Sequence, residues 1–166
     1  MGNTVSNYNV IRVTPTLDAT GAYADNDVLF NPVEIPAAVR GNGGCSKLMQ
    51  ISILNQNTDN CDIDLIFMQK STNLGTINDA PDISDSNAEA ANMLGIWRLD
   101  GSVVSASLGG ARLSTLHAVS AQANQAPLLL QAEDNSTSVY VAGILRDTTP
   151  TFAADDIDII LHIQYK

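Results

Sequence analysis

The stretch CDIDLIFMQK, residues 61–70, alternates polar and apolar side chains. On an extended chain Asp62 and Asp64 share one face, and Ile63 and Leu65 share the other. A period of two is typical of a strand with one face on the core and one in solvent. The stretch therefore predicts a β-strand, and similar runs recur along the whole sequence.

Further strands are predicted wherever a short apolar run is bounded by turn-forming residues. These runs lie at residues 9–18, 27–36, 47–57, 96–100, 111–119, 127–134, 138–147 and 156–166. The run at 27–36 contains two prolines, which suit an edge strand or an interrupted one. The runs at 47–57 and 61–70 form the best candidate hairpin. So many short strands indicate a sandwich or a barrel rather than a βαβ fold.

One segment has the pattern of a helix. In SDSNAEAANMLG, residues 84–95, Ser84 or Asp85 can cap the first turn, and Gly95 can end the helix. Ala88, Ala91 and Leu94 form its apolar stripe. We therefore expect one short helix near residues 85–94. The stretch LDGSVVSASLGGA, residues 99–111, is instead expected to be an exposed turn or arm.

Two stretches resemble each other, TGAYADNDVLF (residues 20–30) and TPTFAADDIDI (residues 149–159). An Asp side chain can accept a hydrogen bond from a nearby backbone N–H and close a turn, and an aromatic ring before the turn can cover the rim of the core. We interpret both stretches as the same device placed before a strand. Chance similarity in a chain rich in Asp and Ala is the competing explanation. The residues concerned are Tyr23 with Asp27, and Phe152 with Asp155 or Asp156.

Composition narrows the class of protein. The 166 residues suit one domain, and 45% hydrophobic against 16% charged residues exclude a disordered chain. The net charge of -10 opposes binding to nucleic acid and to anionic membranes, and it favours a basic partner surface. No apolar run reaches the roughly 20 residues that span a bilayer. Residues 1–9 are polar and are expected to form an N-terminal arm, with a single domain over residues 10–166.

The two cysteines are expected to be free thiols. If residues 57–60 turn a hairpin, Cys45 lies roughly 30 Å down the ladder from Cys61. A disulfide requires Cα atoms within about 7 Å. Free thiols indicate synthesis in a reducing compartment.

No motif points clearly to chemistry. GNGGCSK, residues 41–47, lacks the Gly-Lys-Ser/Thr ending of a phosphate loop and precedes a strand. His117 and His162 have no second ligand at metal-binding spacing. We therefore expect no enzyme activity, no catalytic residue and no cofactor.

The loop NDAPDISDSN, residues 78–87, carries three carboxylates that suit Ca²⁺. They belong to Asp79, Asp82 and Asp85. Their spacing differs from an EF-hand and Pro81 interrupts them, so a solvated loop ending in a helix cap is the first interpretation. Cation binding between Asp79 and Asp85 stays open as the second.

Four longer stretches together resemble a family of small structural proteins of tailed phages. They are VTPTLDATGAYADNDVLF (13–30), GGCSKLMQISILNQNTDNCDIDLIFM (43–68), NDAPDISDSNAEAANMLGIW (78–97) and VYVAGILRDTTPTFAADDIDIILHI (139–163). The family is that of the capsid decoration, or cement, proteins. The resemblance covers most of the chain and implies an all-β fold, a jelly-roll-like β-sandwich with one short helix.

This resemblance also implies a function. The expected protein is made in the host cytoplasm, binds the outer capsid surface and bridges subunits of the major capsid protein, so that the head resists the pressure of packaged DNA. It is expected to be a homo-oligomer, with a trimer preferred and a dimer possible. The alternative is a carbohydrate-binding or tail-fibre sandwich, which would stack sugars on exposed aromatic rings. One Trp and four Tyr supply few such rings.

Overall fold

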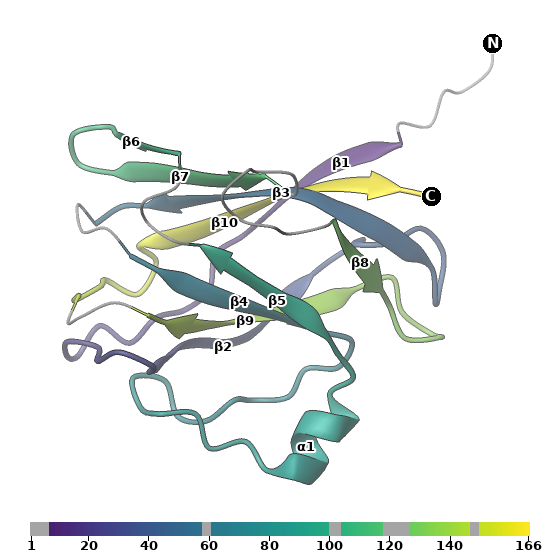
Figure 1. Ribbon diagram of the computed structural model, residues 1–166, viewed down its shortest axis with the longest axis horizontal. Coiled ribbons are helices and arrows are strands. Elements are labelled where there is room, and N and C mark those ends of the chain that lie inside the picture. Colours follow the sequence, from purple (N-terminus) through teal and green to yellow (C-terminus); the bar gives the residue numbers. More distant parts are fainter. Residues whose placement is uncertain (1–6, 58–60, 100–103, 118–126, 147–149) are drawn as a thin grey trace.

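Two antiparallel sheets face each other in the computed structural model, which describes residues 7–57, 61–99, 104–117, 127–146 and 150–166 (Figure 1). The predicted all-β sandwich with one short helix is therefore confirmed. The larger sheet contains, in order, β1 (Tyr8–Val13), β10 (Ile157–Tyr165), β3 (Cys45–Asn55), β7 (Arg112–His117) and β6 (Ser105–Ser107), with β8 (Leu128–Gln131) also beside β3. The smaller contains β2 (Val28–Ile35), β9 (Val139–Leu145), β4 (Ile63–Met68) and β5 (Met93–Leu99).

The strand pairs are nested in sequence. β1 pairs with β10, β2 with β9, β3 with β7 and β4 with β5, all antiparallel. Two further pairs, β10 with β3 and β9 with β4, join these pairs into sheets. The chain therefore runs out and returns along itself, and most neighbouring strands are far apart in sequence.

The predicted hairpin of residues 47–57 and 61–70 is wrong, because β3 and β4 belong to different sheets. β10 takes one edge of β3, while β7 and β8 share the other. Both strands turn apolar side chains into the same interior, including Ile51 and Ile63, each 1% exposed. They therefore contribute to the core from opposite sheets, and residues 56–62 connect the two layers.

Cys45 and Cys61 are free thiols, as expected. The predicted hairpin, however, is not what separates them. Cys45 begins β3, and Cys61 follows the other end of that strand. Eleven residues in β3 separate the two ends by roughly 30 Å. The length of one strand, and not a hairpin register, keeps the thiols apart.

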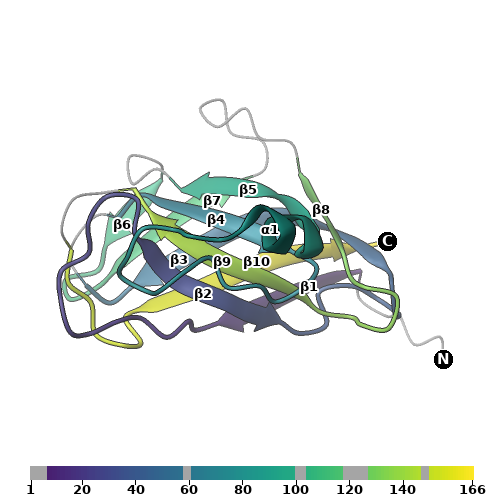
Figure 2. The same ribbon diagram turned by 90° about the horizontal axis from the view of Figure 1, so that it is seen from below.

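The helix α1 spans Asp85–Ala90 and ends earlier than predicted (Figure 2). Ser84 is the N-cap, and its side chain accepts the N–H of Asn87 at 3.4 Å. Asn92 adopts a positive φ of 50°, which ends the helical backbone. Leu94 and Gly95 belong to β5, because Met93 already pairs with Met68 of β4.

The two similar stretches form the same turn and touch each other. Ala24 donates its N–H to Asp27 Oδ2 at 2.6 Å, and Ala153 donates to Asp156 Oδ2 at 2.7 Å. Both rings are buried, with Tyr23 1% and Phe152 5% exposed, and they meet edge to face at 5.6 Å. Ala22 bridges Thr151 between them. We call residues 22–27 and 151–156 the paired turns; they precede β2 and β10, in opposite sheets, and close one end of the sandwich.

The outer sides of the two sheets differ. α1 and the loop before it lie against the smaller sheet, on the side away from the larger one (Figure 1). A second apolar cluster fills that contact, made by Val28, Met68, Leu74, Ala91 and Ala142.

Within the described residues, no helix has the length and apolar character needed to span a bilayer.

Candidate functional site

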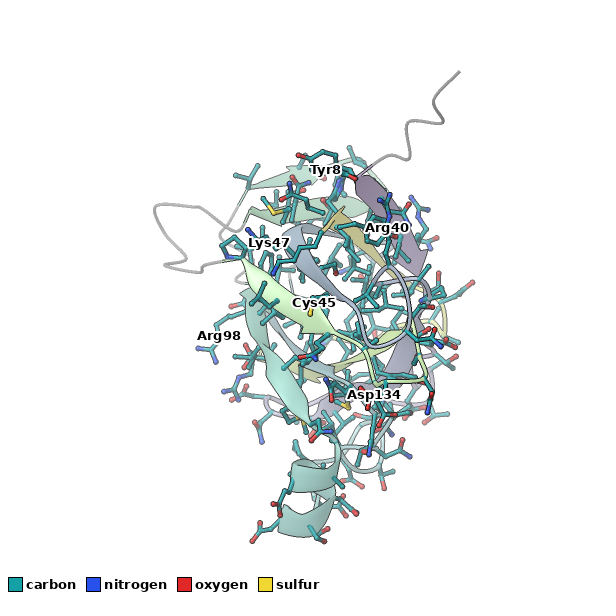
Figure 3. All side chains as sticks on the ribbon, turned by 90° about the vertical axis from the view of Figure 1, so that its right-hand side faces the viewer. Tyr8, Arg40, Cys45, Lys47, Arg98 and Asp134 are labelled. Atoms are coloured by element: carbon teal, nitrogen blue, oxygen red, sulfur yellow. The ribbon has the colours of Figure 1, made fainter. Side chains whose placement is uncertain are left out.

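The first residues of β1 are tied to the end of β10. Tyr165 donates its hydroxyl to the carbonyl of Ala37 at 2.7 Å and accepts from Asn9 Nδ2 at 2.9 Å. The Arg40 guanidinium lies over the Tyr165 ring at 4.7 Å, and it also donates to Asn7 Oδ1 at 3.2 Å. Figure 3 shows Tyr8 and Arg40 at this end of the molecule. Tyr8 and Asn9, which were expected in the arm of residues 1–9, therefore belong to the sheet; residues 1–6 lie outside the described residues.

The acidic loop is anchored by its backbone. Val28 donates its N–H to the carbonyl of Asp79, and the N–H of Asp82 donates to the carbonyl of Leu74, both at 2.9 Å. The Asp82 carboxylate lies close to Gly75, where an added Cβ would stand 2.7 Å from Oδ1. Among the described residues, which include all three carboxylates of the loop, no group of three or more His, Cys, Asp or Glu could hold a metal ion.

The glycine-rich stretch of residues 41–44 closes a backbone turn before β3. The Gly43 N–H reaches the carbonyls of Glu133 and Ser136, each at 3.0 Å. At Gly44 a Cβ would stand 2.2 Å from the carbonyl oxygen of Arg40, so only glycine fits. The expectation that a strand, not a helix, follows this stretch is confirmed.

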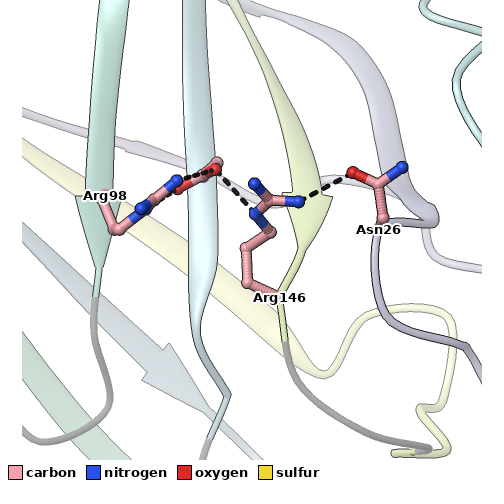
Figure 4. Close-up of polar contacts among 4 residues, drawn as sticks. Asn26, Arg98 and Arg146 are labelled. Carbon is pink, nitrogen blue, oxygen red and sulfur yellow. Dashed lines mark hydrogen bonds and ion pairs between the residues drawn. The ribbon is translucent and has the colours of Figure 1, made fainter.

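A buried carboxylate with two arginines lies on the outer side of the smaller sheet (Figure 4). Arg98 donates Nε and Nη2 to the two oxygens of Asp64, at 2.7 and 2.8 Å. Arg146 Nε approaches the same carboxylate at 3.0 Å, and its Nη1 donates to Asn26 Oδ1 at 2.7 Å. The Asp64 side chain is 4% exposed. The four residues link β4 and β5 to the end of β9 and to one of the paired turns.

Sequence reasoning placed Asp64 on a solvent-facing side and missed this network. The period of two was correct, because Ile63 and Leu65 enter the core and Asp64 points outward. The arginines that cover Asp64 come from β5 and from the residue after β9, 34 and 82 positions later in the chain. The only signal in the sequence was one arginine within each of two later strand-like runs, Arg98 in residues 96–100 and Arg146 in residues 138–147.

A polar groove of about 550 Å³ lies at the end of the sandwich opposite the paired turns. Asp134, labelled in Figure 3, is on its rim, and Lys70 pairs with Glu133 at 3.1 Å. Its amide side chains offer both donors and acceptors. The lining residues are Gln69, Asn92, Gln131, Ala132, Glu133, Asp134, Asn135 and Ser136.

Tyr23 combines a buried ring with a fully used hydroxyl. Its oxygen accepts the N–H of Asp18 at 2.7 Å and donates to the carbonyl of Leu29 at 3.3 Å. Burial raises the pKa of Tyr23 to about 12. Hydrogen bonds from the Thr20 side chain and backbone, and then from Asn78, lower the pKa of Asp18. The end of the sandwich that the paired turns close is therefore held by polar contacts as well as by the rings of Tyr23 and Phe152.

Both histidine positions lie on the larger sheet, where they flank Gln50 in one register row. His162 is half-buried on β10, where it pairs with Val10 of β1 and Gln50 of β3. His117 ends β7 opposite Gln50, and its side chain lies outside the described part of the structure.

No protein-family model and no curated protein sequence matches this chain.

Proposed function

We propose that the protein is a capsid decoration protein of a tailed phage, with jelly-roll connectivity. The strand order carries the proposal. When β6 and β8 are set aside, eight strands remain, in the orders β1-β10-β3-β7 and β2-β9-β4-β5. A hairpin of nested pairs rolled into two four-stranded sheets has this order, and the resulting jelly roll is an architecture of viral capsid and lectin domains.

The interior of the sandwich favours a structural role. Large apolar side chains from both sheets fill it, including Phe30, Phe67 and Trp97, each 2% exposed or less. Such a core makes a rigid body, which suits adhesion between larger assemblies. The protein binds the outer head surface and bridges neighbouring major capsid subunits.

Oligomerisation strengthens this adhesion. One protomer of 166 residues offers little contact area, and linked copies bind a symmetric lattice more tightly by roughly 10²–10⁴ without a new type of contact. A trimer is preferred and a dimer is the alternative. Neither nucleic acid nor a membrane is a partner in this proposal.

The polar groove supports a second candidate, a glycan-binding module. Amide side chains such as Gln69 and Asn92 match hydroxyl groups, which also donate and accept. No aromatic side chain lies among the described residues that line the groove, so a stacking platform for a sugar ring is missing there. Capsid decoration therefore remains the preferred function over glycan binding.

Co-sedimentation with heads that lack the protein tests the proposal. We expect the full-length chain to sediment with heads and to remain in solution with DNA. A chain that starts at Asn7 keeps β1 and measures the contribution of residues 1–6. If the full-length protein ignores heads and is retained by a glycan array, the decoration proposal is overturned in favour of the second candidate.

A further inference from the structure

The outward side chains of the larger sheet form rows that the strand register defines. Tyr8, Gln164, Lys47 and Leu129 lie side by side across β1, β10, β3 and β8. The next rows are Val10, His162 and Gln50; then Arg12, Ile160, Ser52 and Thr115; then Asp158, Leu54 and Leu113. We call these fourteen residues the open face.

Charge is distributed unevenly between the open face and the rest of the protein. Asp158 is the one acidic residue in these rows, and it is already paired with Arg12 at 3.3 Å and with the Thr14 hydroxyl. Lys47 is exposed in the same rows. The other described acidic residues lie in loops, in α1 or on the smaller sheet: Asp18, Asp25, Asp27, Glu34, Asp62, Asp64, Asp79, Asp82, Asp85, Glu89, Glu133, Asp134, Asp155 and Asp156. The net charge of -10 therefore does not describe this face.

The open face also carries exposed apolar side chains. Tyr8 is 63%, Val10 58% and Leu129 55% exposed. Figure 1 shows α1 and its loop on the far side of the smaller sheet, and no other segment that the structure describes lies over the open face. Exposed apolar groups with a polar surround are typical of a surface that binds another protein.

We propose that the open face lies against the capsid and that the surface it meets is a protein surface with carboxylates opposite Arg12 and Lys47. This inference rests on the proposed function. A basic partner follows from the net charge alone, but the register places two cations, Arg12 and Lys47, and one anion on this face. Because Asp158 is paired with Arg12, the net charge of the face is positive. An acidic head surface repels the loops and the smaller sheet, so charge orients the protein with the open face inward. Tyr8, Val10 and Leu129 then fill the contact between the charges.

Two pairs of variants test the inference, each pair with the same change of charge in two places. Val10→Glu alters the open face, and Ile96→Glu alters a side chain that is 51% exposed on the smaller sheet. Lys47→Glu alters the open face, and Lys70→Glu alters an exposed residue beside the groove, where it also removes the surface ion pair with Glu133. Each position is exposed, so thermal unfolding of the four variants should stay near that of the parent protein.

Binding of the full-length variants to heads is measured by co-sedimentation at low and high salt. We expect Val10→Glu and Lys47→Glu to weaken binding by about tenfold or more, and the two control variants to stay within about twofold. A parent protein that does not bind overturns the proposed function itself. A parent that binds, with Val10→Glu and Lys47→Glu binding equally well, overturns only the open face. Tighter binding by Lys47→Glu would mean a basic partner and overturn the inference. If Val10→Glu changes the oligomeric state in ultracentrifugation, a second copy of the chain covers the open face, and the inference is likewise overturned.

Discussion

Removing the Asp156 carboxylate should weaken the turn before β10, and the adjacent Asp155 provides a control. Asp156 Oδ2 accepts the Ala153 N–H at 2.7 Å, whereas Asp155 contributes a backbone carbonyl, to Gln56 Nε2 at 3.1 Å. A hydrogen bond to a charged group is worth about 1.5–3 kcal/mol. Water can replace part of it at a half-buried carboxylate. We expect Asp156→Ala to lower the free energy of unfolding by about 1–2 kcal/mol, and Asp155→Ala by less than about 0.5 kcal/mol.

Calorimetry and urea titration measure both variants. For a chain of 166 residues the loss corresponds to a Tm lower by about 2–8 °C. The equivalent pair in the other turn is Asp27→Ala, with Asp25→Ala as its control. Because Tyr23 and Phe152 join the turns, the double variant of Asp27 and Asp156 should deviate from additivity by about 0.5 kcal/mol or more. Equal losses for Asp155→Ala and Asp156→Ala, or strict additivity of the double variant, would refute the reasoning.

Three further predictions concern single groups. Asp64→Ala leaves two arginines without their shared carboxylate, and it should lower the free energy of unfolding by about 3 kcal/mol in urea titration, with Asp64→Asn losing less. Because the raised pKa of Tyr23 favours the neutral phenol in the folded state, its contribution to stability is complete below pH 10 and lost between pH 10 and about 12. In urea titrations from pH 9 to 11.5, Tyr23→Phe should abolish the part of the stability loss that comes from ionisation of Tyr23. Thiol titration should find the half-exposed Cys45 reactive in the native protein, and the 7% exposed Cys61 reactive only after denaturation. A fast native reaction of both thiols, or an intramolecular disulfide, would contradict this.

Local patterns identified most strands but not their partners. Alternation along β4 and the cap at Ser84 are properties of neighbouring residues, so the sequence contains them. Pairing is not local: β3 has room for three partners, and proximity in sequence favoured β4 over β10. β6 was missed because its three residues, Ser105–Ser107, are all exposed and have no apolar alternation.

The sequence also could not show where the charge lies. Counting residues gives a net charge of -10, but only the register places Arg12 and Lys47 on a face where Asp158 is the one acid. The paired turns were predictable in part. Their shared pattern indicated one device used twice, while the contact between Tyr23 and Phe152 depends on two sheets meeting at one end.

Electron cryo-microscopy of heads that lack the protein, after incubation with the full-length chain, tests the central proposal most directly. We predict added density at regular positions on the outer head surface, fitted by the sandwich with the open face toward the major capsid protein and α1 toward solvent. Heads without added density would contradict the decoration function. Added density with α1 against the head would contradict the open face as the binding surface.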